Sequence, residues 1–176
     1  MRYKKSFTSV AANLTGFASN VTGAIFALTA NDAGDTLAHK VTIRNDSATD
    51  HSGKTVTLVG TDYNGAALTE VVTAPGTSAT VTSTGYFLTL TSATPSATIG
   101  GDTFDIGWAG DAVTAPINVQ PRPRAGVYAL GISVDATGTP AYSLQQSYGG
   151  AWFAHASIVT KTTRFDGSLL TPVMAV

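Results

Sequence analysis

Hydrophobic and polar residues alternate in the middle of the chain as they do in β-strands. The segments KTVTLVGT and AALTEVVTA show this alternation on either side of DYNG, residues 62–65. A period of two residues places successive side chains on opposite faces of a strand. Asn-Gly between two such segments is a common hairpin turn. We therefore predict an antiparallel hairpin whose strands span residues 55–61 and 66–74.

Further short segments of the same kind recur about every ten residues, with turn-forming residues between them. They are GAIFALTA (23–30), HKVTIRN (39–45), ATVTSTGYFLTLTS (79–92), SATIGGDTFDIGWAG (96–110), GVYALGISVD (126–135), TPAYSLQQSYGG (139–150), AWFAHASIVTKT (151–162) and LLTPVMAV (169–176). Strands at this spacing predict an all-β fold, an antiparallel, jelly-roll-like β-sandwich. The chain could form one sandwich or two small β modules.

The predicted organisation has four parts. Residues 1–20 form an N-terminal arm or first strand, 21–112 a β-sandwich module, 113–124 a Pro-rich connector, and 125–176 a second β module or a completing sheet. The arm has a basic start and then an uncharged stretch with few large apolar anchors. Because ordering each residue costs about 1–2 kcal/mol, we expect the arm to be ordered by another chain and not by its own domain.

Composition narrows the range of functions. The chain has no cysteine, so it has neither disulfides nor a thiolate metal site, and its net charge of −1 gives no general attraction to nucleic acid or anionic membranes. Only 12% of residues are charged, about half the usual share. The stretches 6–31 and 71–101 carry no charged side chain at all. Such surfaces are either covered by another chain or solvated through Thr and Ser.

The triplet Gly53-Lys54-Thr55 resembles the end of a phosphate-binding loop. That loop needs a glycine five positions before Gly53, where this chain has Ala48, and a helix after it. The residues after Thr55 instead alternate as a strand. We interpret the triplet as a turn before a strand, and Lys54 as a solvated turn residue.

Other candidate sites are weak. The three histidines, His39, His51 and His155, are not at metal-ligand spacing, so we interpret them as surface or packing residues. Two turn segments could line a cation loop, although neither has the twelve-residue calcium pattern; they contain Asn31, Asp32 and Asp35, and Asp102 and Asp105. Aromatic residues, interpreted as packing residues with a sugar platform as the alternative, are Tyr86, Phe87, Phe104, Trp108 and Trp152. We assign no catalytic, cofactor or metal residue, and we expect the protein not to be an enzyme.

A resemblance gives the functional expectation. The region Leu28–Gly100, with TDYNGAALTEVVTAPG and TGYFLTLTSATPS, resembles structural proteins of tailed bacteriophages. The final third, from GVYALGISVD to LLTPVMAV, resembles a second phage module encoded near capsid and neck genes. In that module a longer acidic loop follows the QQSY-like strand, and here it is reduced to GGA. The role of that loop therefore does not carry over.

The resemblance implies a β-sandwich in the virion. The leading expectation is an accessory capsid protein of the decoration or cement type on the outer shell, in many copies or as a homo-oligomer. Its partners would be the major capsid protein or other virion proteins, reached through the arm and the C-terminal TPVMAV, with no nucleic acid or membrane partner. The alternatives are a neck, tail or fibre component, and a carbohydrate-binding module for host recognition.

Overall fold

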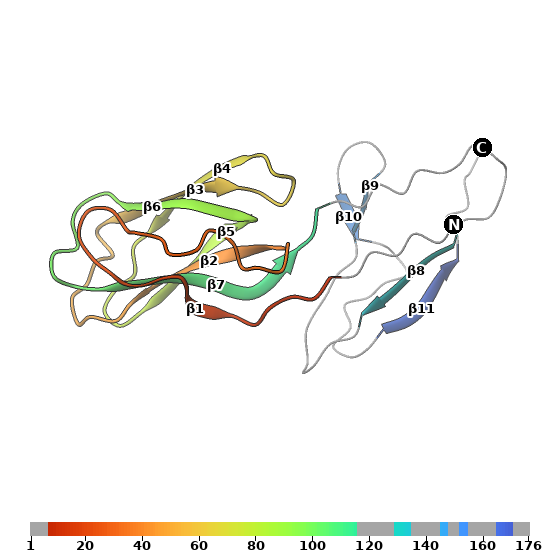
Figure 1. Cartoon of the computed structure of the whole chain (residues 1–176), viewed down its shortest axis with the longest axis horizontal. Coiled ribbons are helices and arrows are strands. Elements are labelled where there is room, and N and C mark those ends of the chain that lie inside the picture. The colour runs from red at the N-terminus through yellow and green to blue at the C-terminus, as the bar shows by residue number, and fades with distance from the viewer. Residues whose placement is uncertain (1–6, 116–128, 135–144, 148–151, 155–164, 171–176) are drawn as a thin grey trace. The chain divides into compact units, whose positions relative to one another are not determined.

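A computed structural model of the chain describes residues 7–115 and four later strands, 129–134, 145–147, 152–154 and 165–170 (Figure 1). The chain divides into two compact units, Met1–Asn118 and Val119–Val176. The division falls within residues 113–124, the stretch in which the sequence places a connector. Each unit is described separately below.

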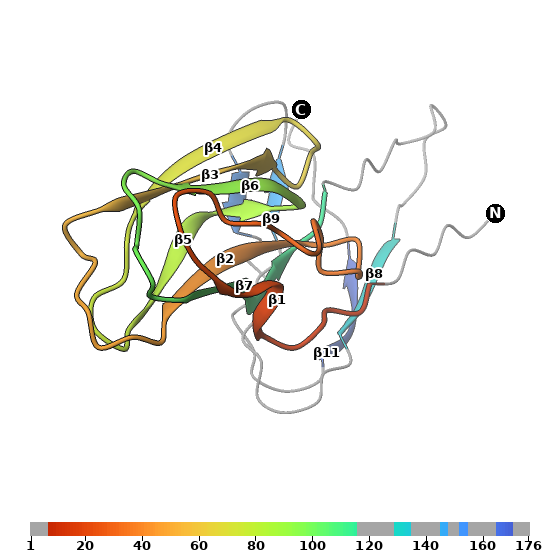
Figure 2. The same cartoon turned by 60° about the vertical axis from the view of Figure 1, so that its left-hand side comes forward.

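Two antiparallel sheets make up the first unit (Figures 1 and 2). The four-stranded sheet has the order β1 (Asn13–Val21), β7 (Phe104–Val113), β2 (Ala38–Asn45), β5 (Thr80–Phe87). The three-stranded sheet has the order β4 (Ala67–Thr73), β3 (Thr55–Thr61), β6 (Thr89–Pro95). The predicted all-β sandwich is confirmed. The described residues form strands, turns and loops, and they include no helix that could cross a membrane.

The core lies between the two sheets and follows from the alternation. On β3, Val56 and Leu58 are fully buried, whereas Val59 faces outward. The four-stranded sheet contributes Ile43, Ile106 and further apolar side chains of β1, β2 and β7. Burial of one such side chain contributes roughly 1.5–3 kcal/mol, so this alternating set supplies the main stabilisation of the unit.

The predicted hairpin is confirmed. Strands β3 and β4 pair in uninterrupted register from Thr55–Thr73 to Thr61–Ala67. The turn is a four-residue turn in which the N–H of Gly65 donates to the carbonyl of Asp62 at 2.9 Å. Gly65 has φ +80°, a conformation that glycine adopts without a steric cost. In this turn it is the glycine of the Asn-Gly pair that supplies the positive φ.

Glu70, which is the only glutamate of the chain, joins the two sheets at one edge. Its carboxylate accepts hydrogen bonds from the backbone N–H of Thr84 (2.7 Å) and of Gly85 (2.8 Å), and from the Thr84 hydroxyl. These donors belong to β5, the edge strand of the other sheet. An inward-pointing charge that uses up edge N–H groups blocks the edge against foreign strands.

The expectation that an arm over residues 1–20 is held by another chain is wrong for residues 13–20. Strand β1 pairs with β7 through Asn13–Trp108, Ala18–Ile106 and Val21–Phe104. Phe17 is 2% exposed and contacts the Trp108 ring edge-on at 5.1 Å. One large anchor and the edge of β7 are enough to order this segment on its own domain. Residues 1–6 lie outside the described part.

A second expectation fails upstream of β2. The segment 23–30 was predicted to be a strand, but it is a loop with a single bridge between Phe26 and Ala93 of β6. The Phe26 side chain is 3% exposed and packs against Phe104. The apolar residues here thus bury one anchor in the core instead of alternating across a sheet.

The second unit contains two short antiparallel pairs. Strand β8 (Ala129–Val134) pairs with β11 (Phe165–Leu170), and β9 (Gln145–Ser147) pairs with β10 (Trp152–Ala154). Each of the four segments predicted in this region overlaps one strand. The last strand covers only the start of the predicted segment 169–176, and residues 171–176 lie outside the described part.

Candidate functional site

The Gly53-Lys54-Thr55 triplet forms a turn, as predicted. The backbone N–H of Lys54 donates to the carbonyl of His51 at 2.9 Å, and Thr55 begins β3. The interpretation of Lys54 as a purely solvated residue is wrong. Its ammonium donates to the carbonyl of Thr98 at 2.8 Å and lies 3.0 Å from Nδ1 of His51. The lysine therefore ties the turn before β3 to the loop after β6.

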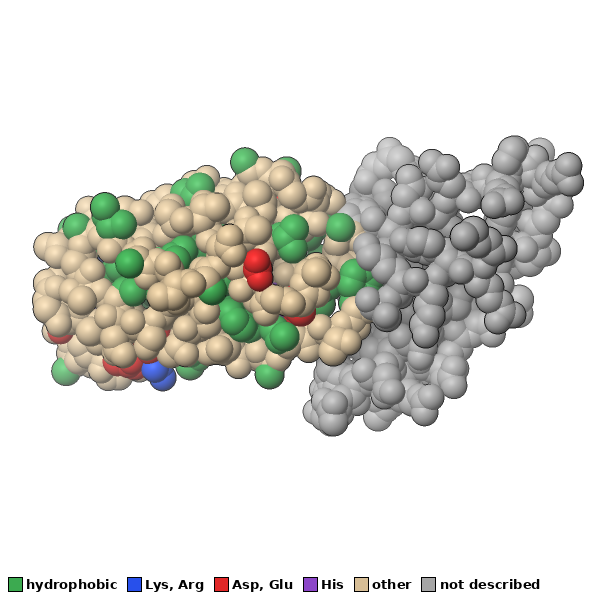
Figure 3. All heavy atoms as spheres, in the orientation of Figure 1, with side chains coloured by type: hydrophobic (Ala, Val, Ile, Leu, Met, Phe, Trp, Pro, Cys, Tyr) green, Lys and Arg blue, Asp and Glu red, His purple; other side chains and the backbone are tan. Residues whose placement is uncertain are grey.

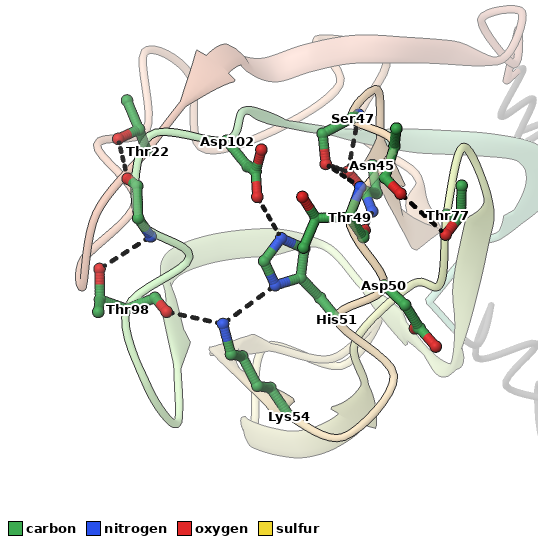
Figure 4. A network of polar contacts seen from close by, with 12 residues as sticks. Thr22, Asn45, Ser47, Thr49, Asp50, His51, Lys54, Thr77, Thr98 and Asp102 are labelled. Atoms are coloured by element: carbon green, nitrogen blue, oxygen red, sulfur yellow. Dashed lines mark hydrogen bonds and ion pairs between the residues drawn. The ribbon is translucent and has the colours of Figure 1, made fainter.

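His51 is the centre of this network (Figure 4). Its ring is 3% exposed, contacts Phe104 edge-on at 5.3 Å, and has Nε2 2.9 Å from Oδ2 of Asp102. Since the Lys54 ammonium can only donate, Nδ1 must accept, and Nε2–H donates to the carboxylate. Both ring nitrogens are satisfied in the neutral Nε2–H tautomer.

The environment of Asp102 favours the carboxylate. Hydrogen bonds from Thr49 and from the His51 ring hold the pKa of Asp102 below its usual range. A His-carboxylate pair can activate a nucleophile when the second ring nitrogen faces a hydroxyl or thiol. Here that nitrogen faces the Lys54 ammonium. The described contacts thus make the cluster a brace between two loops, the one before β3 and the one between β6 and β7.

Asn45 braces the neighbouring loops (Figure 4). Its side chain is 1% exposed, and its amide donates to the carbonyls of Thr49 and Gly76, each at 2.8 Å. Its oxygen accepts from the N–H and the hydroxyl of Ser47. A buried amide satisfied on both sides fixes the loops that it joins.

His39 forms a second buried pair at a different place. Its Nε2 lies 2.9 Å from Oδ2 of Asp35, and Nδ1 lies 3.1 Å from the carbonyl of Ala109. Both neighbours are acceptors when Asp35 is ionised, so both ring nitrogens are satisfied only in the protonated imidazolium. The His39 ring therefore has two acceptors as partners, whereas the His51 ring has one acceptor and one donor.

Asp35 also holds the segment before β1. Its carboxylate accepts the N–H of Val10 and of Leu37, each at 2.9 Å. Burial raises the pKa of Asp35, but these two N–H groups and the His39 ring outweigh burial, and the pKa lies below its ordinary value. This pair thus anchors residues that the sequence assigned to an arm.

The carboxylates proposed for cation loops have intramolecular partners. Asp32 accepts the N–H of Gly34 at 2.8 Å, as Asp residues in turns commonly do. Asp105, which is 1% exposed, accepts the N–H of Asn20 at 2.8 Å and hydrogen bonds from Arg44. Burial raises the pKa of Asp105, but the hydrogen bonds from Arg44 and Asn20 outweigh burial, so that the pKa lies below its usual range.

Within the described residues, no three His or carboxylate side chains come together as a metal site would require. Asp35 and Asp102 lie with different histidines, and Asp105 with an arginine. An open cleft of about 320 Å³ is lined by Asp32, Gly34, Thr36, Leu37, Leu88 and Thr89. Asp32 is the one charged group among these lining residues.

The aromatic candidates of the first unit have packing roles. Phe87 and Phe104 are buried, and Trp108 is 9% exposed with its indole N–H donating to the carbonyl of Ala11 at 3.0 Å. Tyr86 has the Lys40 ammonium 5.2 Å from its ring centre. The His155 position and the Trp152 side chain lie outside the described part.

Glu70 and Asn45 are important polar residues that the sequence reasoning missed. A signal for Glu70 was present, because it falls on the same alternating face of β4 as Leu68 and Val72, which face the core. A lone glutamate on the apolar face of a strand indicates a buried partner. Asn45 carried no comparable signal, since its partners Thr49 and Gly76 are defined only by the loops.

No family model, curated protein or solved structure matches this chain.

Proposed function

We propose that the protein is a non-enzymatic structural component of a tailed-bacteriophage virion, an accessory capsid protein that stabilises the head by binding across capsid subunits. The resemblance of Leu28–Gly100 and of the final third to phage structural proteins supports the virion location. The proposed partner is the major capsid protein, and the proposed place is the outer capsid surface.

One observation carries the proposal, which is the uncharged outer face of the three-stranded sheet. Its side chains alternate with the inward-facing ones along β3 and β4, and along β6 by the register of the pairs. They are Thr55, Thr57, Val59, Thr61, Ala67, Thr69, Val71, Thr73, Ser92 and Thr94. Val59 is 37% and Val71 61% exposed. Figure 3 shows few charged side chains on the face of the first unit turned to the viewer.

A free soluble domain ordinarily carries charges of both signs over its surface. An extended face of Thr, Val and Ser without charge can be desolvated against another protein without burying an unpaired ion. The polar groups that could do chemistry are engaged in joining loops and sheets, as the His51 and Glu70 contacts illustrate. These features favour a protein whose work is to bury surface.

Copy number tests the proposal. Quantitative mass spectrometry of purified particles should find the chain in fixed proportion to the major capsid protein. A small number set by the symmetry of the neck or tail would place it there instead, and absence from particles would overturn the proposal. Binding of the isolated protein to a glycan array, together with a low copy number, would favour host recognition.

Rebinding to particles that lack the protein tests the proposed face. Val59→Lys introduces a charge at the centre of the uncharged face and should weaken rebinding strongly. Ile25→Lys is the matched control, because Ile25 is a 73% exposed apolar residue in the loop beside β6. Equal rebinding of wild type and Val59→Lys would remove the face from the proposal.

A further inference from the structure

The edges of the two sheets are unequally protected. Three of the four edge strands of the first unit have one or two of their backbone groups engaged by other parts of that unit. On β1, the carbonyl of Phe17 accepts the N–H of Thr29 and of Ala30. On β6, the carbonyl of Ala93 accepts the N–H of Phe26, and on β5 the N–H groups of Thr84 and Gly85 bond to Glu70.

Strand β4 is the exception among these four edge strands of the first unit. Its bonds to β3 run through alternate residues, because the N–H of Ala74 donates to Lys54 at one end and Asp62 donates to Ala66 at the other. Residues 68, 70 and 72 therefore bond to β3, whereas 67, 69, 71 and 73 direct their N–H and C=O groups away from it. The side chains of these four residues are exposed as well.

An edge of this type is a template for another strand. Natural proteins protect long, flat edges with charges, prolines, bulges or a covering loop. The seven residues of β4 pair with β3 without a register shift, and the outward residues carry no charge. The one charge of the strand, Glu70, is turned inward and satisfied by β5. Nothing in the described part of the chain disfavours the addition of a strand here.

We propose that β4 pairs antiparallel with β4 of a second copy of this chain, with the two-fold axis at Val71, so that two three-stranded sheets join into one of six strands. Self-pairing about a two-fold axis is the commonest way in which soluble proteins form dimers. It requires a strand whose outward residues complement themselves, and the order Thr69, Val71, Thr73 does so.

The position of the axis follows from the side chains. An axis at Glu70 would place two carboxylates directly opposite each other, which is unfavourable. An axis at Val71 places the exposed Val71 side chain of one copy opposite Val71 of the second copy. It also pairs Thr69 with Thr73 of the second copy. Glu70 then lies opposite Val72 of the second copy and keeps its bonds to β5.

The contact is small compared with the roughly 1,200–2,000 Å² of a stable interface. We therefore expect a weak dimer in isolation, with a dissociation constant of about 0.1–1 mM. It becomes substantial where many copies are held near one another. The contact is measured on the isolated protein and does not depend on the proposed place in the virion.

Amide hydrogen exchange in the wild-type full chain tests the pairing. In dilute protein the N–H groups of Thr69, Val71 and Thr73 should exchange rapidly, while those of Leu68, Glu70 and Val72 are protected by β3. At about 1 mM, the first set should become protected in step with dimer formation measured by sedimentation. Protection of the first set in the monomer would mean that the chain covers its own edge, and would overturn the proposal, as would a monomer at about 1 mM.

The register is tested by cross-linking, which is specific because the chain has no cysteine. In the proposed dimer Val71→Cys faces its own copy at about 5.5 Å between Cα atoms, within disulfide range. Thr69→Cys would lie more than about 13 Å from its counterpart. Oxidation should give a disulfide dimer of Val71→Cys and leave Thr69→Cys monomeric. The reverse result would overturn the register.

A charge at the axis provides the binding test. Val71→Lys sets two ammonium groups opposite each other and should raise the dimer dissociation constant by about tenfold or more. Ile25→Lys, on the covered β6 side, should leave it unchanged. Circular dichroism verifies that both variants fold. If both weaken the dimer equally, or neither does, β4 is not the contact.

Discussion

Removal of the Glu70 carboxylate should destabilise the first unit by about 2 kcal/mol. The carboxylate accepts three hydrogen bonds from Thr84 and Gly85, and a hydrogen bond to a charged group contributes about 1.5–3 kcal/mol where water cannot replace it. Thr84 is exposed and Gly85 half-buried, so water replaces part of what is lost. The expected loss of unfolding free energy is therefore close to that of one well-shielded hydrogen bond and not to the sum of three.

The measurement is urea unfolding of wild type and Glu70→Gln, followed by Trp108 fluorescence. The chain has two tryptophans, and a Trp152→Phe background makes the signal report on the first unit alone. With a slope of about 1–3 kcal/mol per M, a loss of 2 kcal/mol moves the midpoint by about 1 M. The matched control is Asp111→Asn, whose carboxylate is 60% exposed and faces Lys40 at 3.4 Å. Such a surface pair contributes about 0–1 kcal/mol.

The pH dependence identifies the cause. Burial raises the pKa of Glu70, but the bonds from Thr84 and Gly85 outweigh it, so that the folded-state pKa lies below the ordinary value. A lowered folded-state pKa contributes stability above the unfolded-state value, about 4.3, and that stability is lost as the pH falls through the folded-state pKa. The difference between wild type and Glu70→Gln should thus be full at pH 7 and shrink below about pH 4. A loss under 0.5 kcal/mol, or one independent of pH, would refute this account.

Three further substitutions test the other contacts. Lys54→Ala should cost about 1 kcal/mol in unfolding free energy, because its ammonium bridges two loops. Calorimetry with ATP should detect no binding to the wild-type protein, since the triplet is a turn and not a phosphate-binding loop. Asp35→Asn should cost about 3 kcal/mol at pH 7, since it leaves the buried His39 ring without its charged partner; because the folded-state pKa of Asp35 is lowered, this loss should shrink in acid. Gly16→Ala should cost about 1–3 kcal/mol in thermal unfolding, since a Cβ there would overlap the Trp108 indole, and an unchanged midpoint would contradict that packing.

The regular strands could be predicted because their sequence period is local. Strands β3 and β4 alternate without interruption, and their turn contains the glycine that the geometry requires. Strand β1 shows no such period, because its pairing with β7 shifts register twice between Asn13 and Val21. A bulge moves the next side chain to the other face, and the alternation is lost although the strand remains.

The polar clusters could not be predicted from the sequence, since distant loops create them. His51 and Asp102 are 51 positions apart, and Asp105 meets Asn20 across 85 positions. No local pattern joins such residues. Each aspartate has the same turn-forming neighbours whether it binds a cation, an imidazole or a backbone N–H, so residue type and spacing leave its partner open.

The two histidine pairs show how far composition alone can mislead. Only 12% of residues are charged, yet in the described part of the chain several of them join loops, as Lys54 and Asp102 do around His51. His39 lies between two hydrogen-bond acceptors, whereas His51 lies between an acceptor and the Lys54 ammonium. The charged side chains of these clusters lie between loops, and the outer face of the β4-β3-β6 sheet carries no charged side chain. The outward residues of β4 likewise carry no charge that would disfavour the addition of a second strand.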